Sequence, residues 1–245
     1  MESEVQAPGV QLESGPALGF GGKFVNIFAS PRKTFESLDR KPSWVAPLLI
    51  FLLIAVIFTQ ISLPIMMEGQ KEKILSNPNF TDEQRAAMEQ YFVVSTSVRV
   101  RTLITQVIVT PILYLILAGI FYLVGSVFLG GDTTYKRVLA VVSWSWLIMA
   151  LATVVTILIA MSKGNVDVSL SLALLLPADA IGTKFHTFLS QFNFFYIWFL
   201  AVFAFGFGYI YKFSTAKAYA AVGVLWAIWI ALSVALSGVL KQYGF

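Results

Sequence analysis

The sequence contains no cysteine and one histidine, and charged residues make up only 12% of its 245 positions. A chain without cysteine has no disulfides, no thiolate metal sites and no cysteine nucleophile. His186 has no carboxylate nearer in sequence than Asp179, so it lacks local partners for a metal site. Soluble domains carry about 25% charged residues, and the shortage here indicates a chain that lies mostly outside water.

Charge is absent altogether from five long stretches, namely 42–67, 102–131, 138–162, 187–211 and 218–240. Each stretch exceeds the roughly 20 residues that a membrane-spanning helix needs. Backbone polar groups inside a bilayer must pair within their own segment or around a closed barrel, so long apolar runs indicate helices. Aromatic residues alternate over 203–213 as they would in a strand, but the runs on either side are apolar throughout, unlike barrel strands.

The sequence therefore predicts an all-α integral membrane protein, in which five transmembrane helices form a bundle over residues 42–241. The expected spans are 45–64, 103–129, 138–161, 194–211 and 219–240. Residues 1–22 are polar and rich in Gly and Pro, which predicts a short disordered tail without a cleavable signal peptide.

Residues 23–41 have apolar side chains at helical spacing, and Ser30 followed by Pro31 is a typical helix start. This pattern predicts an N-terminal interfacial amphipathic helix in two short pieces that meet at Pro31. Phe35 and Leu38 would lie in the headgroup boundary while the cations face anionic phosphates. The segment can be an anchor alone or a docking face as well. The predicted contact residues are Pro31, Arg32, Lys33, Phe35, Leu38 and Trp44.

Two connections between the spans carry further signals. In the loop 65–102, Thr81 and Gln84 have the spacing of a capping box, which predicts a helix that continues into the second span. Residues 168–178 are apolar but too few to cross a bilayer, so we expect an interfacial or re-entrant segment. Nine of the 17 Lys and Arg residues fall on the side of the N-terminus, which barely separates the two orientations. The basic cluster before the first span favours a cytoplasmic N-terminus and an outside C-terminus.

No Asp, Glu, Lys or Arg lies within the five predicted spans, so they lack the charge-changing group of a proton- or ion-coupled transporter. They also lack paired titratable groups, and we expect no enzyme activity, cofactor or metal. The intramembrane polar side chains are interpreted as hydrogen bonds between helices. The alternative is a pathway for a small neutral solute, lined by Gln60 and Gln106 if these face one another. The candidate polar contacts are Gln60, Gln106, Ser143, Ser145 and Asn193.

Three stretches resemble one known family. They are IFASPRKTFESL followed by KPSWVAPLL, the turn YLVGSVFLGGDTTYKRVLAVV, and the closing pair NFFYIWFLAVFAFGFGYIYKFSTAKAYAAVGVLWAIW. Together they are similar to the bacterial branch of the Yip1 family over about residues 24–240, and the resemblance implies a five-span membrane fold. Many relatives have an acidic residue where Asn193 stands in this chain. Eukaryotic members act in vesicle traffic and bind Rab-type GTPases, a partner that is not expected in a bacterium.

We therefore expect a non-enzymatic, multi-pass protein of the bacterial inner membrane that organises or assists membrane proteins or lipids through contacts. The alternative is a channel or facilitator for a small neutral solute. The expected partners are the lipid bilayer, another membrane protein or a second copy of the chain. Nucleic acid is not expected, because the net charge of +4 forms no dense basic patch.

Overall fold

The computed structural model describes residues 17–76, 80–163, 170–177 and 180–242. Over these residues the chain forms helices and no strand, although an isolated bridge joins Ser171 to Asn193. Five helical segments are long and apolar enough to cross a membrane: Val45–Glu72, Thr96–Phe128, Tyr135–Lys163, Phe194–Tyr211 and Thr215–Ser237. The predicted all-α fold with five membrane-spanning helices is confirmed.

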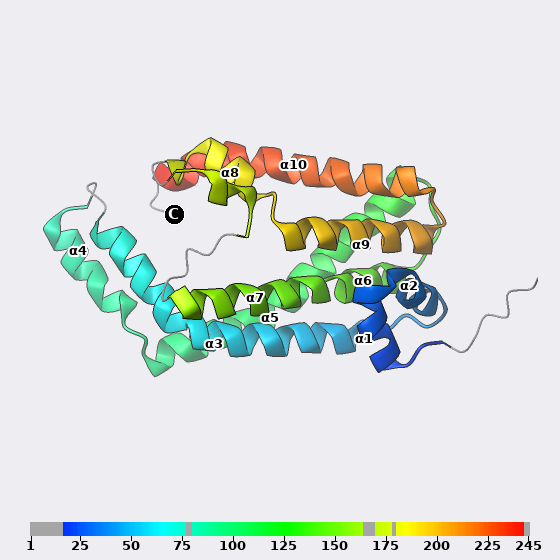
Figure 1. Ribbon diagram of the computed structural model, residues 1–245, viewed down its shortest axis with the longest axis horizontal. Helices are drawn as coiled ribbons and strands as arrows, with labels where there is room; N and C mark the ends of the chain where they lie inside the picture. Colours follow the sequence, from blue (N-terminus) through cyan, green and yellow to red (C-terminus); the bar gives the residue numbers. More distant parts are fainter. Residues whose placement is uncertain (1–16, 77–79, 164–169, 178–179, 243–245) are drawn as a thin grey trace, which may run out of the picture.

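Short helices precede and connect the long ones (Figure 1). The long helices are α3 (Val45–Leu75), α5 (Thr96–Leu123), α6 (Tyr135–Ser145), α7 (Leu147–Lys163), α9 (Phe194–Tyr211) and α10 (Thr215–Gln242). A π-helical turn, η2 (Val124–Phe128), extends α5, while α6 and α7 together form the third span. The short elements are α1 (Phe20–Ala29), α2 (Pro31–Arg40), α4 (Asp82–Glu89), η1 (Gln90–Phe92), η3 (Leu172–Leu175) and α8 (Lys184–Ser190).

The third and fourth spans form the centre of the bundle. We compare the share of the most apolar 18 residues of each span that is buried in protein. This share is 67% for the third span and 50% for the fourth, but only 22%, 17% and 6% for the first, second and fifth. The pair α6–α7 contacts α3, α5 and α9, whereas α10 lies against α9 and α8. The outer helices leave rows of Leu, Ile and Val exposed, which suits them to face lipid tails.

The aromatic residues of the fourth span fill the core from one face of α9. Phe199, Phe203 and Phe207 follow one another at intervals of four residues, with ring centroids 5.9 and 6.1 Å apart. Phe121 of α5 meets Phe203 with centroids 4.4 Å apart. The strand-like alternation of aromatics over 203–213 is thus helical, as expected, because every fourth residue returns to the same face.

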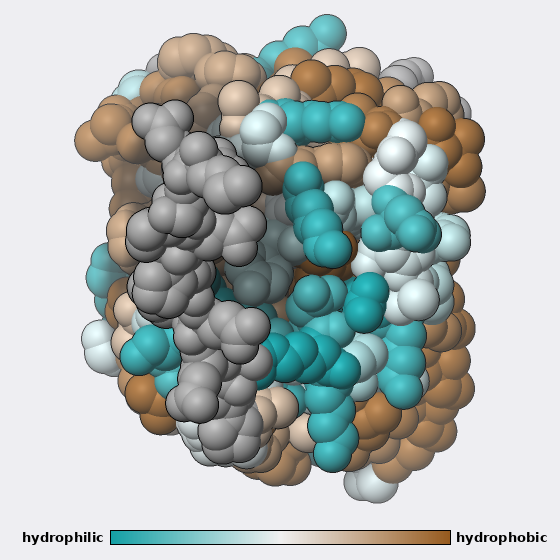
Figure 2. Space-filling view, turned by 90° about the vertical axis from the view of Figure 1, so that its right-hand side faces the viewer, coloured by the Kyte–Doolittle hydropathy of each residue, from teal (hydrophilic) through white to brown (hydrophobic). Residues whose placement is uncertain are grey.

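The two ends of the bundle differ (Figure 1). The N-terminal end, as we name it, carries α1, α2 and the turns 129–134 and 212–214. The far end carries α4, η3 and α8. Seen from the N-terminal end, hydrophilic side chains gather around a hollow, whereas the flanks of the molecule are largely hydrophobic (Figure 2).

The capping box at the far end is confirmed, but the helix that it starts is short. The Thr81 amide donates to Gln84 Oε1 at 2.9 Å, and the Gln84 amide donates to Thr81 Oγ1 at 3.2 Å. The prediction that this helix continues into the second span is wrong, because α4 ends at Glu89 and α5 starts after a new cap. Ser95 Oγ accepts from the Val98 amide at 3.3 Å and fixes that second start.

Residues 168–178 lie partly outside the described residues. The described part forms η3, which contacts α8, and α8 contacts α10. An interfacial or re-entrant placement of this segment stays a prediction.

Candidate contact face at the N-terminal end

The first two helices meet at the predicted break and start earlier than predicted. Ser30 leaves the helical backbone (φ −151°, ψ 72°) and Pro31 opens α2, although no side-chain bond from Ser30 caps it. The predicted start at residue 23 is wrong, because α1 begins at Phe20. The Phe20 ring lies 5.6 Å from the Trp144 ring, and this packing holds the first turn of α1 despite its two glycines.

The apolar face of α2 is buried in protein. Phe35 and Leu38 are each 0% exposed. The Phe35 ring occupies the space beside Gly206, where an added Cβ would lie 2.6 Å from the ring and 2.8 Å from Val141. The expectation that Phe35 and Leu38 lie in the headgroup boundary is therefore wrong. An amphipathic pattern requires an apolar environment on one face, and here α6 and α9 provide it in place of lipid.

The linker from α2 to the first span is held by α1 and α6. Trp144, fully buried on α6, donates its indole N–H to the Ser43 carbonyl at 2.7 Å. The Lys23 ammonium donates to Ser43 Oγ at 3.3 Å, and burial, followed by the charge of Lys41, lowers the pKa of Lys23. Trp44 itself is half-buried against the core at the start of α3. These bonds fix the angle at which the chain enters the first span.

An arginine after the turn 129–134 fixes the end of α2. Arg137 Nε lies 3.0 Å from the backbone oxygen of Asp39 and 3.3 Å from its carboxylate. Thr34 adds a bond within the helix pair, since its hydroxyl donates to the Lys23 carbonyl at 3.1 Å. The pair α1–α2 is thus joined to the membrane domain by buried aromatics, hydrogen bonds and an ion pair.

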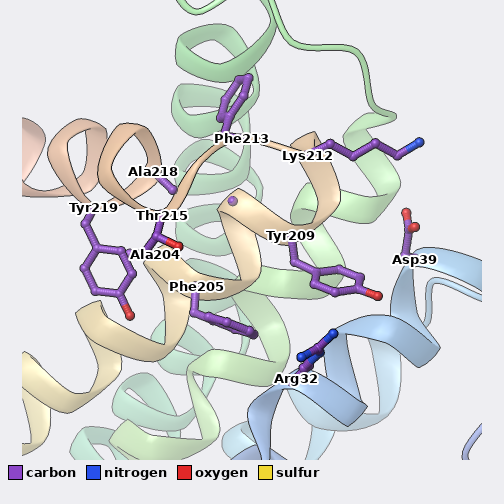
Figure 3. Close-up of a pocket in the computed structure, with 11 residues that line it drawn as sticks. Arg32, Asp39, Ala204, Phe205, Tyr209, Lys212, Phe213, Thr215, Ala218 and Tyr219 are labelled. Atoms are coloured by element: carbon purple, nitrogen blue, oxygen red, sulfur yellow. The ribbon is translucent and has the colours of Figure 1, made fainter.

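The outer face of the same helices is cationic. Arg32, Lys33, Arg40 and Lys41 are exposed, Pro31 is half-buried, and Arg40 is paired with Glu36. Beside this face a cavity of about 450 Å³ opens between α2, α9 and α10 (Figure 3). We define the contact face as the exposed side of α1 and α2 together with the rim of this cavity.

The two intramembrane glutamines link α3 to α5 but not to each other. Gln106 Nε2 donates to Thr59 Oγ1 at 3.3 Å. Gln60 Nε2 donates to the Arg99 carbonyl at 3.2 Å, and Arg99 donates back to the Gln60 carbonyl at 2.9 Å. Because the two amides have different partners, these contacts do not favour a solute pathway lined by both side chains.

The two serines of α6 do not make the interhelical bonds expected of them. Ser143 and Ser145 are each 0% exposed, and neither Oγ has a hydrogen-bond partner within the described residues. Their neighbours on α6 are buried and mostly apolar, including Val142 and Trp144. The small size of serine suits this crowded central helix.

Asn193 caps the fourth span. Its side-chain oxygen accepts from the amides of Phe195 at 2.9 Å and Tyr196 at 3.3 Å. An aspartate would accept the same two bonds and would add a favourable charge at the helix start. Helix capping therefore accounts for Asn193 in this chain.

Three glycines pack directly against aromatic rings, which the sequence analysis did not predict. Gly206 admits Phe35, while Gly125 and Gly131 admit Tyr211, with added Cβ atoms at 2.3 and 2.5 Å from its ring. Tyr211 OH also donates to the Tyr122 carbonyl at 3.2 Å. The glycines stand out in the sequence, but each partner lies 80 or more positions away, so no local pattern indicates the pairs.

Among the described residues no group of three or more His, Asp or Glu side chains is arranged to hold a metal ion. The family model of the Yip1 domain matches residues 25–237, which includes every membrane span, all of α2 and the second half of α1. No curated protein and no solved structure matches the chain. On the extent of the domain match and its agreement with the five-span fold, this chain belongs to the Yip1 domain family.

Proposed function

We propose that this protein organises or assists other membrane components through contacts at its N-terminal end, without catalysing a reaction. The main support is the rigid seating of α2, whose apolar side is buried while Arg32 and Lys33 point outward. A free amphipathic anchor would place its apolar side in lipid. A seated helix instead carries its cations at a fixed position on the membrane domain, as a docking surface requires.

We further propose that the protein lies in a bacterial inner membrane with its N-terminus in the cytoplasm and its C-terminus outside. The cations next to the first span support this orientation, since Lys and Arg near the first span usually remain cytoplasmic. A cytoplasmic contact face would meet anionic headgroups and the cytoplasmic parts of neighbouring membrane proteins. Its protein partner is another membrane protein or a second copy of the chain.

A single cysteine at Lys33 tests both proposals, because the natural chain has no cysteine. In Lys33→Cys the thiol stands on the exposed side of α2. We expect a membrane-impermeant maleimide to label it in inverted inner-membrane vesicles and not in right-side-out vesicles. A benzophenone maleimide at the same thiol should capture one reproducible membrane protein, identified by mass spectrometry.

The matched control is Tyr91→Cys at the far end, where Tyr91 is 70% exposed. We expect the maleimide to label Tyr91→Cys in right-side-out vesicles and not in inverted ones. The benzophenone at this site should not capture the protein that Lys33→Cys captures. Labelling of Lys33→Cys in right-side-out vesicles would reverse the orientation. Capture of lipid alone from Lys33→Cys, or of the same proteins from both sites, would overturn the organising role.

A further inference from the structure

The cavity at the N-terminal end has a polar side and an apolar side (Figure 3). Arg32, Tyr209, Asp39 and Lys212 follow one another along one side of the close-up, with Arg32 and Lys212 at its two ends, while Phe205 and Ala218 contribute apolar lining. The volume of about 450 Å³ falls within the roughly 300–1,000 Å³ of small-molecule sites. An amphiphilic ligand would match both sides of this lining.

Net positive charge remains at the polar side. Among the described residues, neither Arg32 nor Lys212 forms an ion pair or a side-chain hydrogen bond. The carboxylate that lines the cavity, Asp39, is engaged by Arg137 at 3.3 Å, and nearby Glu36 is engaged by Arg40. Two cations without a paired partner among the described residues therefore line the cavity, which favours an anionic ligand.

The backbone conformation of Lys212 sets where this cation lies. Lys212 ends α9 in the left-handed conformation (φ 56°, ψ 32°), the one positive φ among described residues other than glycine. Glycine or asparagine is preferred at such a position, because other side chains incur steric strain. This conformation belongs to the C-terminal cap of α9, in which the Phe213 amide donates to the Gly208 carbonyl at 2.9 Å, and it places Lys212 in the lining of the cavity.

The level of the cavity along the membrane spans indicates which kind of anion it would meet. Its lining comes from the last turns of α9 and the first turn of α10, where two membrane spans end. At that level the phosphates of the bilayer meet the first carbons of the acyl chains. A phosphate held by Arg32 beside Tyr209 would leave the rest of a lipid beside Phe205 and Ala218.

We propose that this cavity binds the phosphate of an acidic glycerophospholipid. Arg32 donates to the phosphate oxygens, the Tyr209 hydroxyl is a second donor, Lys212 adds positive charge at the edge of the cavity, and the apolar lining takes the ends of the acyl chains next to the glycerol. The site goes beyond the organising role and does not depend on it, since a lipid can bind whether or not a protein docks on the outer side of α2.

The test is a titration of phosphatidylglycerol into the full-length chain in detergent, with bound lipid counted by native mass spectrometry. We expect the double variant Arg32→Gln/Lys212→Gln to bind about tenfold more weakly, because a charge-assisted hydrogen bond and a second positive charge are lost. The matched control, Lys136→Gln/Lys184→Gln, removes the same charge from exposed cations that lie outside the contact face and do not line the cavity. It should bind nearly as well as the natural chain.

Competing ligands separate the possible sources of the phosphate. Phosphatidylcholine and millimolar inorganic phosphate should each fail to displace phosphatidylglycerol. Displacement by inorganic phosphate would overturn the lipid assignment in favour of a free phosphate ester, and displacement by phosphatidylcholine would overturn acidic-lipid selectivity. Equal loss of binding in the two double variants would overturn the site itself. Equal thermal unfolding temperatures for both variants exclude misfolding as the cause of a difference.

Discussion

Replacing Phe35 by alanine is expected to lower the free energy of unfolding by about 3–5 kcal/mol, the range for a large aromatic removed from a core. The ring is 0% exposed and fills the space beside Gly206, so its removal leaves a cavity between α2 and α9. If Phe35 instead lay among lipid headgroups, lipid would fill the space and the unfolding free energy would change little.

The effect is measured by equilibrium unfolding of the purified protein in mixed micelles. Lys33→Ala, on the exposed side of the same helix, should change the free energy by no more than about 0.5 kcal/mol. Gly206→Leu probes the same contact from α9, where its side chain would overlap the Phe35 ring. A Phe35→Ala effect as small as that of Lys33→Ala would show that α2 is not seated on the bundle.

Gly125→Leu is expected to lower the free energy of unfolding by about 3 kcal/mol or more. A Cβ at this position would lie 2.3 Å from the Tyr211 ring, so the ring must move. Tyr211 would then lose its contact with Ser126 at 3.1 Å and its bond to the Tyr122 carbonyl at 3.2 Å. The π-helical turn η2, which contains Gly125, holds the second span against the fourth through these contacts.

Gly119→Leu is the matched control for this prediction. Gly119 lies on α5, and an added Cβ there meets nothing within 4 Å. Leucine favours helix over glycine by about 1 kcal/mol, so this control should be neutral or slightly stabilising. Thermal unfolding followed by tryptophan fluorescence ranks the two variants. Equal unfolding temperatures would contradict the close packing of Tyr211 on Gly125.

The five spans could be predicted from the sequence because the bilayer imposes a length and a composition on each span separately. Local capping could also be predicted at Thr81 and Gln84, whose two hydrogen bonds depend on neighbouring residues alone. The break between α4 and α5 could not be predicted from the capping box, which indicates where a helix starts and not where it ends, whereas Ser95 starts a new helix with its own cap.

The candidate site could be predicted only in part. The spacing of Phe35 and Leu38 required an apolar environment for one side of α2, but periodicity does not distinguish lipid from protein. The choice depends on Gly206, which lies more than 170 positions away and gives room for the Phe35 ring. The role of Lys212 could not be predicted, since neither its left-handed conformation nor its place in the same cavity lining as Arg32 follows from the local sequence.

Backbone hydrogen exchange of α2 in lipid nanodiscs tests the central claim, that the N-terminal helix pair is a seated part of the membrane domain. The exposed helix α4 serves as the reference for weak protection, since none of its residues is buried. The seating of Phe35 and Leu38 predicts that α2 amides exchange nearly as slowly as those of α6, and that Phe35→Ala removes this protection. Exchange of α2 as fast as that of α4 in the natural chain would contradict the claim and restore α2 as a peripheral anchor.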